Sequence, residues 1–141
     1  MKKIVFFQGT FDIVNTGHIR AFELAKSYGD ILVVGLNTDE LVSRDKHEPY
    51  LPYSQRREIV EANENVDIVI PCDDEQALPY LKMLDADVFV LTKEWEERHR
   101  ETGIRWMNEK GGEVVFSPRW DDIECSSDIR AEVIRRHEEG R

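Results

Sequence analysis

Five short apolar segments, each rich in Val, Ile or Phe, constrain the fold of this 141-residue chain most strongly. Their apolar residues are nearly continuous rather than alternating, which is typical of strands covered on both faces of a parallel sheet. The segments are Ile4–Phe7, Ile31–Leu36, Val66–Ile70, Val88–Leu91 and Val114–Phe116. Stretches with helical patterns separate them. This alternation predicts an α/β fold, a doubly wound five-stranded parallel sheet with helices on both faces.

Five helices are expected to connect and follow these strands. Ser54 is the expected cap of the second helix, Pro79 starts or interrupts the third, and Gly103 is a possible break in the fourth. The expected helices cover about 18–28, 54–63, 75–84, 94–109 and 126–139. No repeat or linker divides the sequence, so we predict a single domain over residues 1–141.

The composition excludes several classes of partner. The formal net charge of −10 argues against duplex DNA and anionic membranes, which need a positively charged face. No apolar run approaches the roughly 20 residues of a membrane span, and Met1–Lys3 leads directly into a strand rather than into a signal peptide. We therefore expect a cytoplasmic protein that binds neither nucleic acid nor membrane. Cys72 and Cys125 are too far apart in sequence for a C-x-x-C motif and read as ordinary reduced thiols.

Residues 9–18, Gly-Thr-Phe-Asp-Ile-Val-Asn-Thr-Gly-His, join the first strand to the first helix. A helix N-terminus offers free backbone N–H groups and a positive dipole end, which favours a bound phosphate. His18 lies in the first turn, where the dipole opposes a positive charge, so a neutral or transiently protonated donor to a phosphate oxygen is the better reading. The segment lacks both the G-x-G-x-x-G and the P-loop pattern.

The same segment resembles the G-T-F-D and H-x-G-H signature of cytidylyltransferase-like nucleotidyltransferases. The resemblance continues along the chain in the family's order, through Asn37–Glu40, Tyr53–Arg57 and Cys125–Arg130. Within the superfamily, the chain is similar to glycerol-3-phosphate cytidylyltransferases and to the adenylyltransferase domain of ADP-heptose synthesis, the latter also at Gly111–Val115. The resemblance implies a Rossmann-like nucleotidyltransferase fold.

The resemblance also implies a reaction. A small phosphorylated or phosphonate alcohol attacks the α-phosphorus of CTP, and pyrophosphate leaves. Two anions must meet, so catalysis depends on positioning and electrostatic stabilisation, with Mg²⁺ as the expected ion. A homodimer is implied as well.

The family's functional positions map onto this chain residue by residue. His18 would donate to the α-phosphate, and Ser126 and Ser127 would hold the β- and γ-phosphates at the last helix. The implied nucleotide contacts are Gly9, Thr10, Phe11, Asn15, Gly17, His18, Arg119, Ser126 and Ser127. The implied acceptor contacts are Asp12, Arg44, Lys46, Arg56 and Trp95. The implied catalytic group is His18, Asn15, Lys46 and Arg119.

Several of these residues have structural alternatives. Ser126 and Ser127 are also suitable helix caps, and Trp95 suits the core as well as the site. Asp12 either orients the loop or lies near the acceptor. Arg44 and Lys46 fall in an aperiodic stretch, 43–52, that is either a solvated loop or a basic loop over the site. Arg56 and Arg57 are also typical of a solvated helix surface beside Glu58 and Glu61.

The sequence departs from the family pattern in three places. Asn15 replaces the first histidine of H-x-G-H; it keeps an N–H donor but cannot carry a positive charge. In the loop after the second strand and at the end of the third, where glycerol-3-phosphate enzymes carry several lysines, this chain has Asp45, Cys72, Asp73 and Asp74. The segment Trp120–Glu124 is about two residues longer than the matching loop, which bears on the choice of base.

Three other functions remain open at this stage. An adenylyltransferase would use ATP to make an ADP-sugar or a coenzyme. A nucleotide-binding protein with little or no catalysis would account for Asn15. A flavodoxin-like binding module would explain the fold, but not the ordered motifs.

Overall fold

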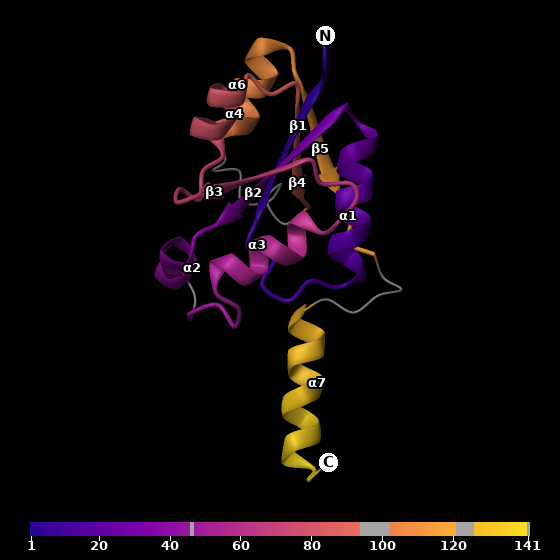
Figure 1. Cartoon of the computed structure of the whole chain (residues 1–141), viewed down its shortest axis with the longest axis vertical. Coiled ribbons are helices and arrows are strands. Elements are labelled where there is room, and N and C mark those ends of the chain that lie inside the picture. The colour runs from indigo at the N-terminus through magenta and orange to yellow at the C-terminus, as the bar shows by residue number, and fades with distance from the viewer. Residues whose placement is uncertain (46, 94–101, 121–125, 141) are drawn as a thin grey trace.

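The computed structural model describes residues 1–45, 47–93, 102–120 and 126–140 (Figure 1). Five parallel strands form one sheet in the order β3-β2-β1-β4-β5. Their bounds are β1 Ile4–Gly9, β2 Ile31–Asn37, β3 Ile68–Cys72, β4 Val88–Thr92 and β5 Glu113–Ser117. Each predicted strand is present, although β3 begins two residues later than expected. The doubly wound α/β fold is therefore confirmed.

The described helices are α1 Thr16–Ser27, α2 Asp39–Asp45, α3 Tyr53–Glu61, α4 Leu78–Leu84, α6 Thr102–Lys110 and α7 Ser126–Glu138. One expectation about helix ends is wrong. The N-cap of α3 is Pro52, with no side-chain capping bond, so Ser54 lies inside the helix. Gly103 is buried in the first turn of α6, and the part of the expected helix that precedes Thr102 lies outside the described residues. Helix α2 was not expected at all, because its short sequence gives little apolar periodicity.

The sheet separates two apolar layers because side chains alternate along each strand. Val5 and Phe7 of β1 face a core built with Phe22 of α1 and Val60 of α3. Phe6 points the opposite way, into a second core that includes Leu81 of α4 and Met107 of α6. Helices α1 and α3 therefore cover one face, and α4 and α6 cover the other.

The strand order has its switch point between β1 and β4: β2 and β3 are added on one side of β1, and β4 and β5 on the other. Strand β1 pairs with β2 on one side and β4 on the other, and all pairs are parallel. Ligands of such sheets bind beyond the carboxyl ends of the strands at this switch point. Residues 9–18 leave the carboxyl end of β1, which places them at that edge.

Candidate nucleotide-binding site

The turn after β1 depends on a close packing of Phe11 over Gly9. Phe11 has φ +47°, a left-handed conformation that costs free energy in a residue other than glycine. Its ring is buried and makes an edge contact with Phe7, with centroids 5.4 Å apart. A Cβ on Gly9 would lie 2.7 Å from the Phe11 ring. The first glycine of the motif is thus required by this ring.

Asn15 is the N-cap of α1. Its Oδ1 accepts from the backbone N–H groups of Gly17 at 2.9 Å and of His18 at 3.3 Å. In return, the backbone N–H of Asn15 donates to Nδ1 of His18 at 3.1 Å. This reciprocal pair is a capping box in which His18 takes the place usually held by Glu or Gln. The asparagine at the departure from H-x-G-H therefore has a structural role.

The capping bond also defines the protonation of His18. Because Nδ1 accepts a hydrogen bond, the neutral ring carries its proton on Nε2, and Nε2–H is the donor that remains for a ligand. Burial lowers the pKa of His18 below its ordinary value. The Phe11 ring stands edge-on to the imidazole, with centroids 5.5 Å apart. His18 is therefore a neutral, oriented donor at a helix N-terminus.

Arg56 lies inside the protein rather than on a helix surface or against a ligand. Its side chain is fully buried. Its guanidinium donates to three carbonyl oxygens and one carboxylate, namely Leu51 O at 3.0 Å, Thr10 O at 2.9 Å, Asn37 O at 2.8 Å and Asp39 Oδ1 at 2.7 Å. The prediction that Arg56 contacts the acceptor is corrected: this residue ties the loop after β1 to the end of β2 and to the segment before α3.

Asp12 has the loop-orienting role that the sequence left open. Its carboxylate accepts from the backbone N–H groups of Tyr50 at 2.8 Å and Leu51 at 2.9 Å. The same segment meets α7, where Arg130 lies 5.6 Å from the centre of the Tyr50 ring. Arg130 Nη1 is also 3.2 Å from Nε2 of His47. The 47–51 segment is thus held between the first loop and the last helix.

Two residues that the sequence reasoning missed connect the ends of β1, β2 and β3. Nε2 of Gln8 donates to Asn37 Oδ1 at 2.9 Å and to the carbonyl of Asp74 at 2.8 Å. Nδ2 of Asn37 donates to Oγ1 of Thr10 at 3.2 Å. The signals in the sequence were the polar side chain at the end of each apolar run and, for Asn37, its place in the family-like segment Asn37–Glu40. This network links the first loop to the loop after β3.

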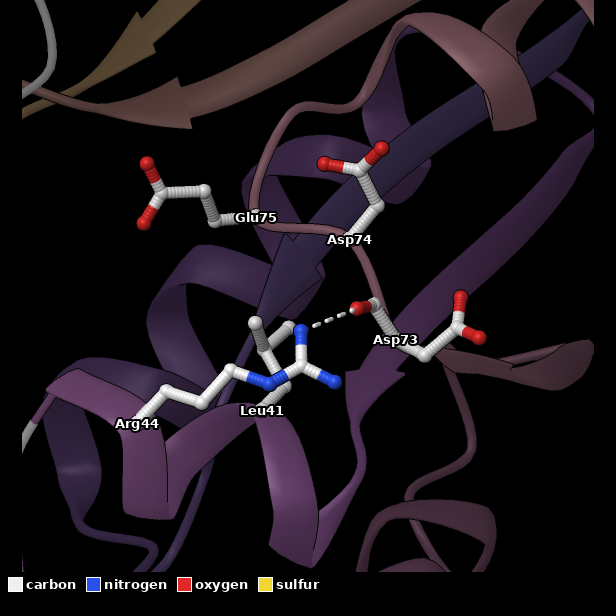
Figure 2. A pocket seen from close by; sticks show the side chains of 5 residues that line it. All are labelled: Leu41, Arg44, Asp73, Asp74 and Glu75. Carbon is white, nitrogen blue, oxygen red and sulfur yellow. Dashed lines mark hydrogen bonds between the residues drawn. The ribbon is translucent and has the colours of Figure 1, made fainter.

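Arg44 lies at the end of α2 and points across a cavity toward the loop after β3 (Figure 2). The cavity has a volume of about 560 Å³ and is lined by Leu41, Arg44, Asp73, Asp74 and Glu75. Nη1 of Arg44 donates to the carbonyl of Asp73 at 3.4 Å. The residue therefore does not lie in a simple solvated loop but ends a helix beside a cavity.

The remaining predicted positions fall at the carboxyl edge of the sheet or outside the described residues. Arg119 follows β5 and is exposed. Ser126 and Ser127 form the start of α7, which the sequence predicted. Lys46 and Trp95 lie outside the described residues.

In the described part of the chain, no group of three or more His, Cys, Asp or Glu side chains could hold a metal ion. Among the helices of that same part, none is long and apolar enough to span a bilayer.

A family model described as cytidylyltransferase-like matches residues 6–137. The chain belongs to the cytidylyltransferase-like family. The predicted class of nucleotidyltransferase is thereby confirmed. A solved structure of a lipopolysaccharide core biosynthesis protein from Thermoplasma volcanium has the same fold, with a TM-score of 0.73 and 22% identity over 86% of this chain and 100% of that one.

Curated members of this family include relatives with different names. Glycerol-3-phosphate cytidylyltransferase of Bacillus subtilis is 35% identical over 134 residues, which cover 94% of this chain and 98% of that protein. FAD synthase of Ferroglobus placidus is 38% identical over 144 residues, 96% of this chain and 88% of that protein. The bifunctional protein HldE of Sulfurimonas denitrificans is 39% identical over 97 residues, 67% of this chain. The alignment covers only 20% of HldE.

Proposed function

We propose that this protein transfers CMP from CTP to a small phosphorylated or phosphonate alcohol and releases pyrophosphate. One P–O bond forms between an acceptor oxygen and the α-phosphorus, and the bond from that phosphorus to the pyrophosphate oxygen breaks. The observation that carries the proposal is the arrangement of His18, a neutral Nε2–H donor fixed at the N-terminus of α1 beside the switch point.

His18 suits the charge that develops in this reaction. Negative charge grows on the oxygens around the α-phosphorus, and a pre-oriented donor stabilises it without reorganising. A neutral donor needs no proton from solution, which agrees with the lowered pKa of His18. Asn15 acts by capping α1 and holding the imidazole, so the loss of the first histidine is compatible with catalysis.

Other parts of the site are assigned to the nucleotide on the family resemblance. Ser126 and Ser127 at the start of α7 would hold the β- and γ-phosphates, and Arg119 would face the nucleotide. We propose that Mg²⁺ arrives on the triphosphate and neutralises part of its charge. The proposed acceptor contacts are Arg44, Lys46 and Trp95.

An adenylyltransferase is the second candidate. FAD synthase of Ferroglobus placidus matches nearly the whole chain, and its product carries an adenylyl group. In this alternative, ATP takes the place of CTP and the same His18 donor is used. The longer segment from Trp120 to Glu124 follows the last strand, where a change in length can alter the contacts that choose the base.

Pyrophosphate release tests both candidates. CTP or ATP with Mg²⁺ is incubated with a panel of phosphorylated alcohols, and the product is identified by mass. We expect turnover with CTP to exceed turnover with ATP. Higher turnover with ATP would favour the second candidate, and no release with either nucleotide and any acceptor would contradict the proposal.

Homodimerisation and a cytoplasmic location are further proposals that rest on the family resemblance. Met107 is buried in the core of its own chain, whereas Met83 is largely exposed and is available to an apolar interface. Sedimentation of the purified chain would test the dimer.

A further inference from the structure

Helix α7 extends away from the sheet, and its C-terminal end is far from the other elements (Figure 1). Val133 and Ile134, in the middle of the helix, are 61% and 48% exposed, so apolar burial does not anchor them. Arg136 pairs with Glu132 of the same helix at 2.7 Å. The position of α7 relative to the sheet is therefore set near its N-terminal end, which is the end assigned to the nucleotide.

Arg130, in the first half of α7, contacts the 47–51 segment at two side chains. Its Nη1 lies 3.2 Å from Nε2 of His47, and its guanidinium carbon lies 5.6 Å from the centre of the Tyr50 ring. The His47 and Tyr50 rings are themselves neighbours, with centroids 5.3 Å apart. Since the backbone N–H of Tyr50 donates to Asp12, these contacts connect α7 to the first loop.

The two polar contacts of the His47 imidazole define its protonation state. An arginine side chain has donors and no acceptor, so Nε2 of His47 must accept from Arg130. Nδ1 lies 2.6 Å from the carbonyl oxygen of Glu48, and a carbonyl oxygen only accepts, so Nδ1 carries the proton. His47 is therefore neutral in this arrangement, with its proton on the ring nitrogen opposite to the one that bears it in His18.

A second proton on His47 is incompatible with this contact. It would be placed on Nε2, where it would set one donor against another and one positive charge against another at 3.2 Å. In the part of the chain that the structure describes, the groups facing the ring are Arg130 from α7 and, from its own segment, the Tyr50 ring and the Glu48 carbonyl. The carboxylate of Asp12 faces the same segment but accepts from its backbone N–H groups rather than from the imidazole. Histidine is the side chain that titrates near neutral pH, so this contact can respond to pH.

We propose that His47 and Arg130 form a proton-controlled latch, in which the neutral imidazole holds α7 against the 47–51 segment and the protonated imidazole releases it. The consequence for function rests on the proposed nucleotidyl transfer. Ser126 and Ser127 begin α7 and are assigned to the β- and γ-phosphates, so release moves them relative to the first loop. His47 is then a positioning residue, and acid weakens nucleotide binding through it.

Three variants isolate the latch. His47→Gln keeps a side-chain oxygen that accepts from Arg130 at every pH, whereas His47→Lys carries a permanent positive charge in place of the protonated ring. His137→Gln, in the last turn of α7, is the matched control, because it removes a histidine that is exposed and lies outside the latch. Hydrogen exchange of α7 in the ligand-free full chain is measured by mass spectrometry at pH 8 and pH 5.5, and each rate is divided by the intrinsic rate at that pH.

The exchange of α7 tests the latch without a nucleotide. Wild type and His137→Gln are expected to lose protection about threefold to tenfold from pH 8 to pH 5.5, the range of a single hydrogen bond. His47→Gln should remain protected at both pH values, and His47→Lys should be unprotected at both. The same response to pH in wild type and His47→Gln would overturn the latch, whether or not the protein transfers a nucleotide.

Calorimetric titration with CTP and Mg²⁺ tests the positioning role. From pH 8 to pH 5.5, the affinity of the wild type should fall about threefold to tenfold further than that of His47→Gln, because protonation of the nucleotide itself affects both alike. An equal fall would overturn the positioning role. A smaller fall in the wild type would overturn it too, because it would show that the protonated ring attracts the triphosphate directly. A pH response of α7 without binding or turnover of CTP or ATP would contradict the proposed transfer and leave the latch intact.

Discussion

The two ring nitrogens of His18 have different roles. Nδ1 completes the capping box of α1, and Nε2–H remains as the donor to a phosphate oxygen in the proposed reaction. We expect His18→Ala to lower kcat by at least about 10²-fold, the usual cost of losing a transition-state donor. The fold is expected to persist, with His18→Gln as the control that keeps a capping side chain at this position. The measurement is pyrophosphate release together with circular dichroism, and wild-type turnover in His18→Ala would remove the residue from the mechanism.

The lowered pKa of His18 predicts a pH dependence of stability. Between the folded-state pKa and the ordinary value of 6.5, the unfolded chain binds the proton more strongly than the folded one. Stability from this group is therefore present above pH 6.5 and is lost as the pH falls below it. Urea denaturation from pH 8 to pH 5 should show a steeper loss in the wild type than in His18→Gln. Parallel curves would contradict this assignment.

Asn15 allows capping to be separated from charge. Asn15→Ala removes the Oδ1 acceptor and should cost about 1 kcal/mol of unfolding free energy. Asn15→Asp keeps the cap and its stability but places a negative charge beside the phosphates, so nucleotide affinity should fall. Asn15→His is expected to match or exceed wild-type turnover with some loss of stability, because imidazole is not among the favoured caps. Denaturation and nucleotide titration of the three variants check this, and a large loss of turnover in Asn15→His would show that catalysis requires asparagine.

For single residues, the sequence identified the 9–18 loop but not which of its residues cap the helix and which are available to a ligand. The motif was enough to select His18, because its place in a first helical turn is readable from spacing. The capping exchange was not readable, since it depends on the φ and ψ angles of Asn15 and on which ring nitrogen turns inward. The burial of Arg56 was also hidden: an arginine beside Arg57 and Glu58 has the composition of an exposed helix.

At the scale of the elements, helix α3 supports the candidate site through the side chain of Arg56. Arg56 satisfies the carbonyls of Thr10, Asn37 and Leu51, which belong to three separate segments. Its replacement by methionine would leave these acceptors without donors, so we expect a loss of roughly 3–5 kcal/mol of unfolding free energy. Arg56→Lys should recover only part of it, because an ammonium cannot reproduce the planar fork.

Arg57 is the matched control for this prediction. It follows Arg56 in α3 but pairs with Glu61 on the exposed surface, at 2.6 Å. Arg57→Met should change stability by less than about 1 kcal/mol, as expected for a surface ion pair. Chemical denaturation of both variants provides the measurement, and equal effects at the two positions would contradict the role assigned to Arg56.

The elements themselves were largely predictable from apolar runs, with one instructive exception. Helix α2 contains only two buried apolar residues, Leu41 and Val42, which is too few for a periodic signal. It begins instead from polar contacts, with Thr38 Oγ1 accepting from the N–H of Leu41 at 3.3 Å and Asp39 held by Arg56. Polar contacts of this kind depend on residues distant in sequence and therefore escape a local pattern.

For the molecule as a whole, the strand order brings distant parts of the chain to one edge. Spacing and composition predicted five parallel strands, but not that β1 pairs with both β2 and β4, because an apolar run carries no information about its neighbour. That pairing places residues 9–18 at the switch point. The last helix contacts the 47–51 segment through Arg130. The backbone of the same segment donates to the carboxylate of Asp12 in the first loop. This edge of the sheet thus brings together segments from the start, the middle and the end of the sequence.

A ligand that binds the folded chain alone must raise its stability by RT ln(1 + [L]/Kd), about 2.7 kcal/mol at a hundredfold excess over Kd. We therefore expect thermal unfolding with Mg²⁺ and CTP to shift upward by several degrees, and by less with ATP. Because His18 is assigned to the transition state, His18→Ala should keep most of this shift while losing turnover. A shift that disappears in His18→Ala would move the residue into ground-state nucleotide binding. The absence of a shift with both nucleotides would contradict nucleotidyl transfer by this protein.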